Sequence, residues 1–362
     1  MPLKEPSWWY SDNAQHRARL LAPLSYIYGR ITTRRLRYAQ PYTSLIPVIC
    51  VGNFTAGGAG KTPLTILLAE HLNRIGEKPA LLTRGYGGSL PGPHLVDPAR
   101  DNASRTGDEA LLLARCAPTV VARDRAEGAR LLEALPDRPT AIVMDDGLQN
   151  PGLAKMLRLA VVDAKRGVGN CRVIPSGPLR APLLDQLDLV DAIIINAGPI
   201  EPDQEPTVPG ALIEMFRQLR FRGPILRGGI VPRTDLATLK GQTVLAFAGI
   251  GHPERFFDTL RLCGINVAEA VSFKDHHFFD AGDAERLLFR AKALGAQLVT
   301  TEKDHVRLLS YEDQRGELAA RTTAFQIKMA LAEDDMVQLA ALVQHAVNSA
   351  DLIEDQLQRC AK

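Results

Sequence analysis

The feature that most constrains the fold of this chain is a glycine-rich loop between a short apolar run and a helical pattern. Residues 47–53 (PVICVGN) predict a buried strand, and residues 62–75 have the apolar spacing of a helix. Between them, residues 52–62 read GNFTAGGAGKT. Glycines in that setting let backbone N–H groups turn toward phosphate oxygens, and the helix N-terminus adds its positive dipole end. The loop therefore predicts a phosphate site on a sheet of parallel strands.

We expect consecutive loop residues to hold the phosphates of a nucleotide: Thr55, Ala56, Gly57, Gly58, Ala59, Gly60, Lys61 and Thr62. Lys61 is expected to reach the terminal phosphates, and Thr62 to ligate Mg²⁺. Thr55 departs from the usual pattern G-x-x-x-x-G-K-[ST], which begins with glycine. The alternative is a glycine-rich turn without a ligand, which Gly-Lys-Thr between a strand and a helix disfavours.

Apolar runs and helical patterns alternate along the rest of the chain. Strands are predicted at 78–83, 118–122, 140–146, 159–163, 192–196, 243–250, 267–273 and 297–301, and helices at 108–115, 123–135, 253–263, 284–294 and 335–347. Such alternation is typical of parallel sheets covered by helices on both faces. A stretch rich in proline and glycine (AGPIEPDQEPTVPG) follows Asn196 and is the best linker candidate.

We therefore expect an α/β fold with two α/β/α lobes and a cleft between them. The larger lobe would hold a parallel sheet like that of P-loop NTPases, and the C-terminal lobe would be smaller. The expected boundaries are an amphipathic membrane-surface segment at 1–42, the phosphate-binding lobe at 43–200, a linker region at 201–225 and the C-terminal lobe at 226–362.

Two aspartates end one of the predicted strands. Asp145 and Asp146 follow the apolar residues 141–144. At the carboxyl end of a strand beside a phosphate loop, an aspartate holds Mg²⁺ directly or through water. Because adjacent residues after a strand point in different directions, we expect Asp145 to ligate the metal and Asp146 to lie close by. The alternative is a pair of turn residues before Gly147.

Charged residues follow other strands. In TRGYGG, Arg84 leaves a strand and either holds a phosphate or belongs to a flexible glycine turn. Asp108 opens a helix in a GDE sequence, where it is either a simple N-cap or the base that takes a proton from an acceptor hydroxyl. Arg172 and Arg180, in CRVIPSGPLRAP, either hold an anionic acceptor or are solvated.

A histidine pair follows a strand in the second half of the chain, in the order Asp275, His276, His277. Three interpretations remain open. An imidazole reaches into the cleft to support catalysis, the pair is structural and faces solvent, or both rings ligate one metal, which is disfavoured because adjacent side chains alternate in direction. The TEKD sequence at 301–304 either contacts nucleotide or closes the cleft. It is not N-K-x-D, so a guanine-specific pocket is not indicated.

The first forty residues differ from the rest in charge and aromatic content. They hold seven lysine and arginine residues against two acidic ones, whereas the whole chain has a formal net charge of +2. Both tryptophans and five of the seven tyrosines lie before residue 43. One helical stripe is formed by Leu20, Leu24, Ile27 and Ile31, and Pro23 allows two shorter helices. A basic amphipathic helix of this kind suits an anionic membrane surface. The alternative is a helix packed on its own domain with solvated arginines.

Composition excludes several classes of protein. The near-neutral charge excludes a strongly basic nucleic-acid binder. No apolar run reaches the roughly 18 residues of a spanning helix, and the N-terminus has no apolar core of a secretory signal. The five cysteines are scattered without a C-x-x-C pair, so we expect a reducing compartment and no disulfide framework.

Taken in order, these motifs resemble one family, the tetraacyldisaccharide 4'-kinases of lipid A biosynthesis. The resemblance rests on VGNFTAGGAGKTP, TRGYGG, GDEALLLAR, DDGLQN, RGVGN with PSGPLR, AFAGIGHPERFF, DHHFF and TEKD. The basic, aromatic N-terminus is also similar to the membrane-docking segment of the family. Asn150 stands where the family usually has histidine in DDGFQH, so a role for that histidine is unsupported here. Thr83 stands where SRGYGG is usual.

The resemblance implies that the γ-phosphoryl group of ATP passes to the 4'-hydroxyl of tetraacyldisaccharide 1-phosphate and gives the 1,4'-bisphosphate, with Mg²⁺ as the metal. It implies a peripheral or monotopic protein on the cytoplasmic side of the bacterial inner membrane, attached by its N-terminal segment. No nucleic acid and no obligate protein partner are expected.

The resemblance also assigns roles to residues. Thr62 and Asp145 would position Mg²⁺, with Asp146 close to the reacting groups. Asp108 would be the base, and His276, supported by Asp275, would orient Asp108 or tune its pKa. The residues expected near the acceptor or the transferring phosphoryl group are Arg84, Tyr86 and Arg180.

Two other classes remain as alternatives. One is a P-loop switch ATPase or GTPase that acts on a protein partner at the membrane surface. The other is a membrane-surface scaffold with a degenerate nucleotide site, which the intact Lys61, Thr62 and Asp145 disfavour.

Overall fold

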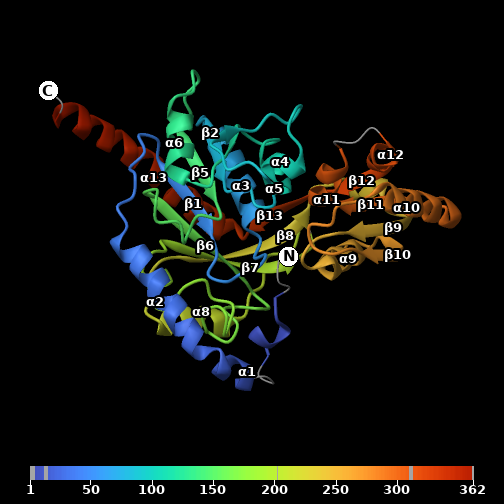
Figure 1. The fold of residues 1–362 in the computed structure, drawn as a ribbon, viewed down its shortest axis with the longest axis horizontal. Coiled ribbons are helices and arrows are strands. Elements are labelled where there is room, and N and C mark those ends of the chain that lie inside the picture. Colours follow the sequence, from blue (N-terminus) through green and yellow to red (C-terminus); the bar gives the residue numbers. More distant parts are fainter. Residues whose placement is uncertain (1–4, 12–14, 202, 310–312, 361–362) are drawn as a thin grey trace.

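Two β-sheets organise the part of the chain that the structure describes (Figure 1). The structure is a computed structural model that describes residues 5–11, 15–201, 203–309 and 313–360, with the backbone alone at residue 15 and residues 350–360. One sheet has nine strands and the other has four. The expected α/β class with a large, mainly parallel sheet is confirmed.

The nine-stranded sheet has the order β13-β8-β7-β6-β1-β5-β2-β4-β3. Its strands are β1 (Val48–Gly52), β2 (Pro79–Thr83), β3 (His94–Leu95), β4 (Thr119–Val121), β5 (Ala141–Asp145), β6 (Leu157–Asp163), β7 (Ala192–Pro199), β8 (Ile225–Pro232) and β13 (Ile327–Leu331). Only the edge strands β3 and β13 pair antiparallel. Because β1 pairs parallel with β5, with Val51 opposite Asp145, the phosphate loop after β1 and the aspartates after β5 leave the same edge of the sheet.

Helices cover both faces of this sheet because alternate strand residues on each face are apolar. Ile49 and Val51 face α3 (Lys61–Arg74), α5 (Asp108–Leu113) and α13 (Glu333–Cys360). Val48 and Cys50 face α6 (Arg125–Glu133). Two further helices, α7 (Leu183–Leu187) and α8 (Gly210–Gln218), pack over β6 and β7.

The four-stranded sheet is parallel throughout, in the order β10-β9-β11-β12. Its strands are β9 (Thr243–Ala248), β10 (Asn266–Ser272), β11 (Gln297–Thr301) and β12 (Thr322–Phe325). One face packs on α9 (Pro253–Leu262), and the other packs on α10 (Ala281–Leu294) and α12 (Gln314–Arg321). From the end of β11, α11 (Glu302–Leu308) reaches α5 of the larger sheet, where Val306 shares a buried cluster with Leu111.

The sheets divide the chain differently from the expected boundaries. Strands β8 and β13 lie in the second half of the chain but complete the larger sheet, and α13 covers it. The range 201–225, expected as a linker, contains α8. The signal for β13 was weak because only Gln326 separates it from β12, so two strands of different sheets form one apolar stretch.

The N-terminal segment contains two helices, α1 (Gln15–Leu20) and α2 (Ala22–Tyr38). Pro23 lies in the first turn of α2, where its missing N–H removes no helical hydrogen bond. The small residues of α2 face the protein, since Ser25 Oγ donates to the Val173 carbonyl at 2.8 Å and Gly29 lies against Pro182. Among the described helices, none has the length and apolar character needed to cross a membrane. Lys4 and Asp12 lie outside the described residues.

Candidate active site

The phosphate loop is held in shape by backbone torsions and by neighbouring segments. Gly57 and Gly60 have φ values of 97° and 95°, which glycine adopts without strain, and Gly60 is the N-cap of α3. An added Cβ at Gly60 would come within 2.4 Å of Asn196 Nδ2, which donates to the Ala59 carbonyl. The Ala56 N–H donates to the Pro178 carbonyl at 2.7 Å, so this N–H is already used by the fold.

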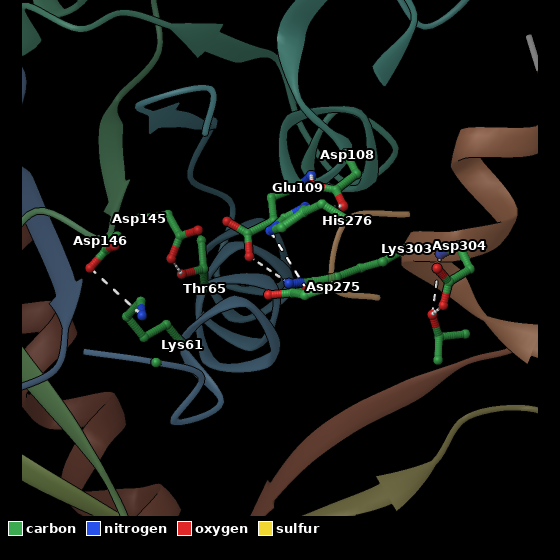
Figure 2. A network of polar contacts seen from close by, with 12 residues as sticks. Lys61, Thr65, Asp108, Glu109, Asp145, Asp146, Asp275, His276, Lys303 and Asp304 are labelled. Atoms are coloured by element: carbon green, nitrogen blue, oxygen red, sulfur yellow. Dashed lines mark hydrogen bonds and ion pairs between the residues drawn. The ribbon is translucent and has the colours of Figure 1, made fainter. Parts of the chain in front are cut away.

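Lys61, the first residue of α3, points toward the acidic residues at the end of β5 (Figure 2). Its Nζ lies 3.3 Å from Asn53 Oδ1 and 3.7 Å from Asp146 Oδ1. The ammonium group is therefore held at the mouth of the loop, where the last phosphates of a nucleotide would lie.

Asp145 has a buried carboxylate oxygen that is free to bind a cation. Its carboxylate is 1% exposed, and Oδ1 accepts a hydrogen bond from Thr65 Oγ1 at 3.1 Å. Oδ2 is buried with no hydrogen-bond partner, a costly state that a bound cation would relieve. Thr62 lies three residues before Thr65, on the face of α3 from which Thr65 contacts Asp145. Burial, followed by the charge of Glu109, raises the pKa of Asp145 to about 7.

Asp146 is neutralised by two cations. Arg180 donates to both of its carboxylate oxygens, at 2.6 and 3.2 Å, and Lys61 Nζ lies 3.7 Å from Oδ1. Burial alone would raise the pKa of Asp146, but the charges of Lys61 and Arg180 outweigh it and hold this pKa below its usual range. Arg180 also donates from Nε to the Thr55 carbonyl at 3.0 Å, so it links the aspartate to the phosphate loop.

Asp108 begins α5 and is only 3% exposed. Its Oδ1 accepts from the Glu109 N–H at 2.9 Å, and its Oδ2 contacts His276 Nδ1 at 3.3 Å and the guanidinium of Arg307. Burial alone would raise the pKa of Asp108, but the hydrogen bond from His276 and the charges of Arg307 and Lys303 lower it below its usual range. The N-cap of α5 is Gly107, so the N-cap interpretation of Asp108 is wrong, and Asp108 is a buried carboxylate held by specific cations.

The two adjacent histidines have separate partners. His276 adopts φ 55° and reaches Asp108, whereas His277 Nε2 lies 2.7 Å from Asp283 Oδ2 and its ring stacks on Phe273. Joint ligation of one metal is therefore not supported. The hydrogen bond to Asp108 raises the pKa of His276 above its ordinary value. Asp275 Oδ1 is 3.9 Å from His276 Nε2, which is an ion-pair distance and too long for a hydrogen bond.

The other predicted substrate residues lie around this pair. The Tyr86 ring is 5.4 Å from the His276 ring, and Tyr86 is 54% exposed. Arg84 is exposed at the end of β2. Asn150 accepts from the Gly152 N–H and from Lys155, so the position where the family usually has histidine holds a turn together here.

Sequence reasoning missed a set of ion pairs between α5 and α11. Lys303 Nζ lies 2.5 Å from Glu109 Oε1 (Figure 2). Arg307 contacts Asp108. The signal was present, because Lys303 and Arg307 are four residues apart on one face of a helix that begins within the TEKD motif.

A second group of charges links the N-terminal segment, the phosphate loop and the smaller sheet. Glu5 lies against Gly57, where an added Cβ would meet its Oε1 at 1.7 Å, and Glu5 Oε2 pairs with Arg166 at 2.8 Å. Arg166 Nη2 lies 3.4 Å from His252 Nδ1. Burial, with the charges of Arg166 and Arg255, lowers the pKa of His252 to about 4.

His252 gives a testable pH dependence of stability. Its pKa is about 4 in the fold and about 6.5 in the unfolded chain, so between these values only the unfolded chain binds the proton. Stability therefore falls as pH drops from about 6.5 to about 4. We expect His252→Asn to lose less stability than the wild type over this range, by roughly 1 kcal/mol after allowance for the partial exposure of the ring. Urea unfolding at several pH values measures the difference, and parallel curves for the two proteins would contradict it.

Comparisons with known proteins agree with this geometry. A family profile described as tetraacyldisaccharide-1-P 4'-kinase matches residues 17–346. A tetraacyldisaccharide 4'-kinase of Rhodopseudomonas palustris (strain BisA53) is 48% identical over 336 residues, which cover 92% of this chain and 93% of that protein. One of Methylobacterium nodulans is 46% identical over 342 residues, which cover 94% and 95%. The crystal structure of "apo" form LpxK from Aquifex aeolicus in complex with ATP has a TM-score of 0.69 and 25% identity, and the match covers 91% of this chain and 99% of that one.

A phosphate loop at the carboxyl edge of a parallel sheet, beside paired carboxylates, is typical of nucleotide-dependent phosphotransferases. Within that class, the chain belongs to the tetraacyldisaccharide 4'-kinase family. The resemblance that the ordered motifs indicated is therefore confirmed, and with it the assignment to a family of ATP-dependent kinases of lipid A biosynthesis. The alternative of a switch ATPase is not favoured.

Proposed function

We propose that this chain transfers the γ-phosphoryl group of ATP to the 4'-hydroxyl of a membrane-held tetraacyldisaccharide 1-phosphate. The observation that carries the proposal is the pairing of Asp108 with His276, which joins a buried carboxylate of the larger sheet to the smaller sheet beside the phosphate loop.

Nucleotide binding would use the loop from Thr55 to Thr62. Its N–H groups and the α3 N-terminus would hold the phosphates, and Lys61 would turn from Asp146 toward the terminal phosphate. Thr62 and Asp145 fit Mg²⁺, which when bound would neutralise charge on the phosphate oxygens. Arg180 binds both Asp146 and the Thr55 carbonyl, so it would hold Asp146 and the phosphate loop in the same relative position while Lys61 moves.

The transfer step forms one bond, breaks one bond and moves one proton. The acceptor oxygen forms a bond to the γ-phosphorus, the bond from that phosphorus to the bridging oxygen of ADP breaks, and the hydroxyl proton passes to Asp108. Because a sugar hydroxyl has a high pKa, the proton leaves late, and the carboxylate mainly orients the nucleophile. The hydrogen bond to Asp108 raises the pKa of His276, which favours the charged imidazolium beside the carboxylate.

The two sheets would act as lobes that close on the substrates. The α5–α11 contact places Asp108 beside the positive charge of Arg307 on α11. Closure of the lobes would therefore complete the site, and it would exclude water, which otherwise competes with the lipid as acceptor. Arg84 and Tyr86, exposed beside His276, would contact the acceptor or the transferring phosphoryl group.

The N-terminal helices would dock the enzyme on the cytoplasmic face of the inner membrane. The apolar stripe faces away from the protein: Leu20, Leu24, Ile27 and Ile31 are 81%, 58%, 56% and 57% exposed. Arg30, Arg34 and Arg35 are exposed nearby and would meet lipid phosphates. Not all of the aromatic residues take part, because Trp9 is buried and donates from Nε1 to the Pro175 carbonyl.

The stripe can be tested without removing the segment. We expect the triple variant Leu24→Ser, Ile27→Ser, Ile31→Ser to lose most of its binding to anionic vesicles, because burial of these side chains in the interface drives docking. Phe289→Ser is the matched control, since Phe289 is a 74% exposed apolar residue on α10 of the smaller sheet. Sedimentation at rising salt should weaken wild-type binding further. Equal sedimentation of the triple variant and the control would reject the docking surface.

The substrate assignment is tested with three acceptors: the tetraacyldisaccharide 1-phosphate, the same lipid already phosphorylated at the 4'-position, and the disaccharide without acyl chains. We expect rapid ATP consumption only with the first, and a product that carries the new phosphate at the 4'-oxygen. Equal turnover with the 4'-phosphorylated lipid would place the acceptor hydroxyl elsewhere.

A further inference from the structure

We propose that Arg307 is a positioning residue that fixes the orientation of the Asp108 carboxylate and directs Oδ1 toward the acceptor hydroxyl. The inference rests on the proposed role of Asp108 as the base. It concerns a residue of the smaller sheet that touches neither the phosphate loop nor the predicted metal ligands.

The guanidinium of Arg307 contacts four residues, because Nη2 also lies 3.4 Å from His276 Nδ1. Nε lies 3.0 Å from Asp108 Oδ2, and Nη2 contacts the same oxygen. Nη1 lies 2.7 Å from Asp304 Oδ1 and 2.8 Å from the Gly249 carbonyl. The Arg307 side chain is only 10% exposed, and the carboxylates of Asp108 and Asp304 are almost completely buried. A planar fork that donates in several directions suits this site, and a lysine ammonium could not replace all of these bonds.

Arg307 itself is held in place by Asp304, which is anchored by hydrogen bonds of its own. Asp304 accepts from Thr301 Oγ1 at 2.7 Å and from the Gly249 N–H at 3.1 Å. These bonds tie the start of α11 to the end of β9, so the guanidinium is fixed before it meets Asp108. Lys303, on the same face of α11, pairs with Glu109 and aligns α5 with α11 (Figure 2).

The hydrogen-bond count then assigns the two oxygens of Asp108 to different tasks. Oδ2 faces both Arg307 donors and His276 Nδ1. Oδ1 accepts from the Glu109 N–H, and a carboxylate oxygen with two lone pairs can accept one more donor. Oδ1 is thus the oxygen that receives the proton of the acceptor hydroxyl.

Arg307 also sets the charge around the base. The charged and titratable groups that face Asp108 are Arg307, Lys303 and Asp304 from α11, His276 and Asp275 from the loop after β10, and Glu109 from its own helix. Without Arg307 one cation is lost, so the pKa of Asp108 rises toward its ordinary value. The acidic limb of the pH–rate profile then moves to higher pH, because the carboxylate protonates more readily.

The experiment uses the full chain with ATP, Mg²⁺ and the tetraacyldisaccharide 1-phosphate. We expect Arg307→Ala to lower kcat by about 100-fold, the size expected for a misplaced catalytic group, with KM for ATP within about twofold of the wild type. Added guanidinium ion, well below unfolding concentrations, should restore part of the lost kcat. Arg307→Lys should keep the positive charge but lose the planar, forked set of donors, so its kcat should lie between those of the wild type and Arg307→Ala. Arg261→Gln, which breaks an exposed ion pair with Asp258, is the matched control and should be unchanged.

The outcomes separate the possibilities. A kcat near that of the wild type in Arg307→Ala or Arg307→Lys would overturn the proposal. So would an equal fall in ATP affinity and kcat that added guanidinium does not restore. If Arg307→Ala does not fold, Arg307→Lys decides, because it keeps the charge and loses the planar fork, so a wild-type kcat in this variant would reject positioning. A wild-type enzyme that transfers no phosphate to the lipid would instead contradict the proposed function itself.

Discussion

Replacing Asp108 by alanine is expected to lower the rate of phosphoryl transfer by about 10³-fold, within the range that a general base contributes, while ATP affinity changes by less than about twofold. The side chain is buried beside His276 and Arg307, and no bond joins it to the phosphate loop. Its removal therefore takes away the proton acceptor and leaves the nucleotide site in place. Turnover with the lipid acceptor and ATP binding by fluorescence titration measure the two quantities separately.

The control for Asp108→Ala is another aspartate at a helix start. Asp124 is the N-cap of α6 and accepts hydrogen bonds from the N–H groups of Ala126 and Glu127. Asp124→Ala should cost about 1 kcal/mol of stability and leave turnover unchanged. If Asp108→Ala behaves in the same way, or if it loses ATP affinity in proportion to its rate, then Asp108 has a structural role at the start of α5 and is not the base.

Lys61→Ala is expected to reduce kcat/KM for ATP by about 10²–10³-fold, the size expected when one charge that stabilises the transition state is removed. Lys61 carries the ammonium group of the phosphate loop, and its present partners Asn53 and Asp146 hold that group in place. The fold should survive, because Arg180 continues to bind both Asp146 and the Thr55 carbonyl.

The matched control for this variant is Lys78→Ala. Lys78 forms an exposed ion pair with Asp137 on the surface, where such pairs contribute little. We expect normal kinetics from it. Wild-type turnover by Lys61→Ala, measured beside this control, would refute the assignment of the phosphate loop.

The parts of the fold that local chemistry determines could be predicted from the sequence. β1 and β5 lie within one residue of their predicted bounds because buried parallel strands are continuous apolar runs ended by polar residues. The start of α3 followed from Gly60 and the position of Pro63. Pro23, expected to allow two shorter helices, lies in the first turn of the 17-residue α2, and α1 ends just before it.

Long-range placement could not be predicted in this way. Nothing in the local pattern of β13 says that it pairs with β8, more than ninety residues earlier. The same limit applies to the site. Asp108 and His276 were each singled out from the motif in which they lie, but Arg307 lies beyond its motif and becomes significant only when α11 packs on α5. The choice between His276 and His277 depends on the positive φ of His276, which the sequence does not reveal.

The measurement that tests the proposed function most directly is a transfer assay with γ-labelled ATP, Mg²⁺ and detergent-dispersed tetraacyldisaccharide 1-phosphate. We expect label to enter the lipid phase with the wild-type protein, and to be lost with Lys61→Ala and Asp108→Ala. Release of labelled phosphate without the acceptor, and no label in the lipid, would contradict a lipid kinase and support a switch ATPase.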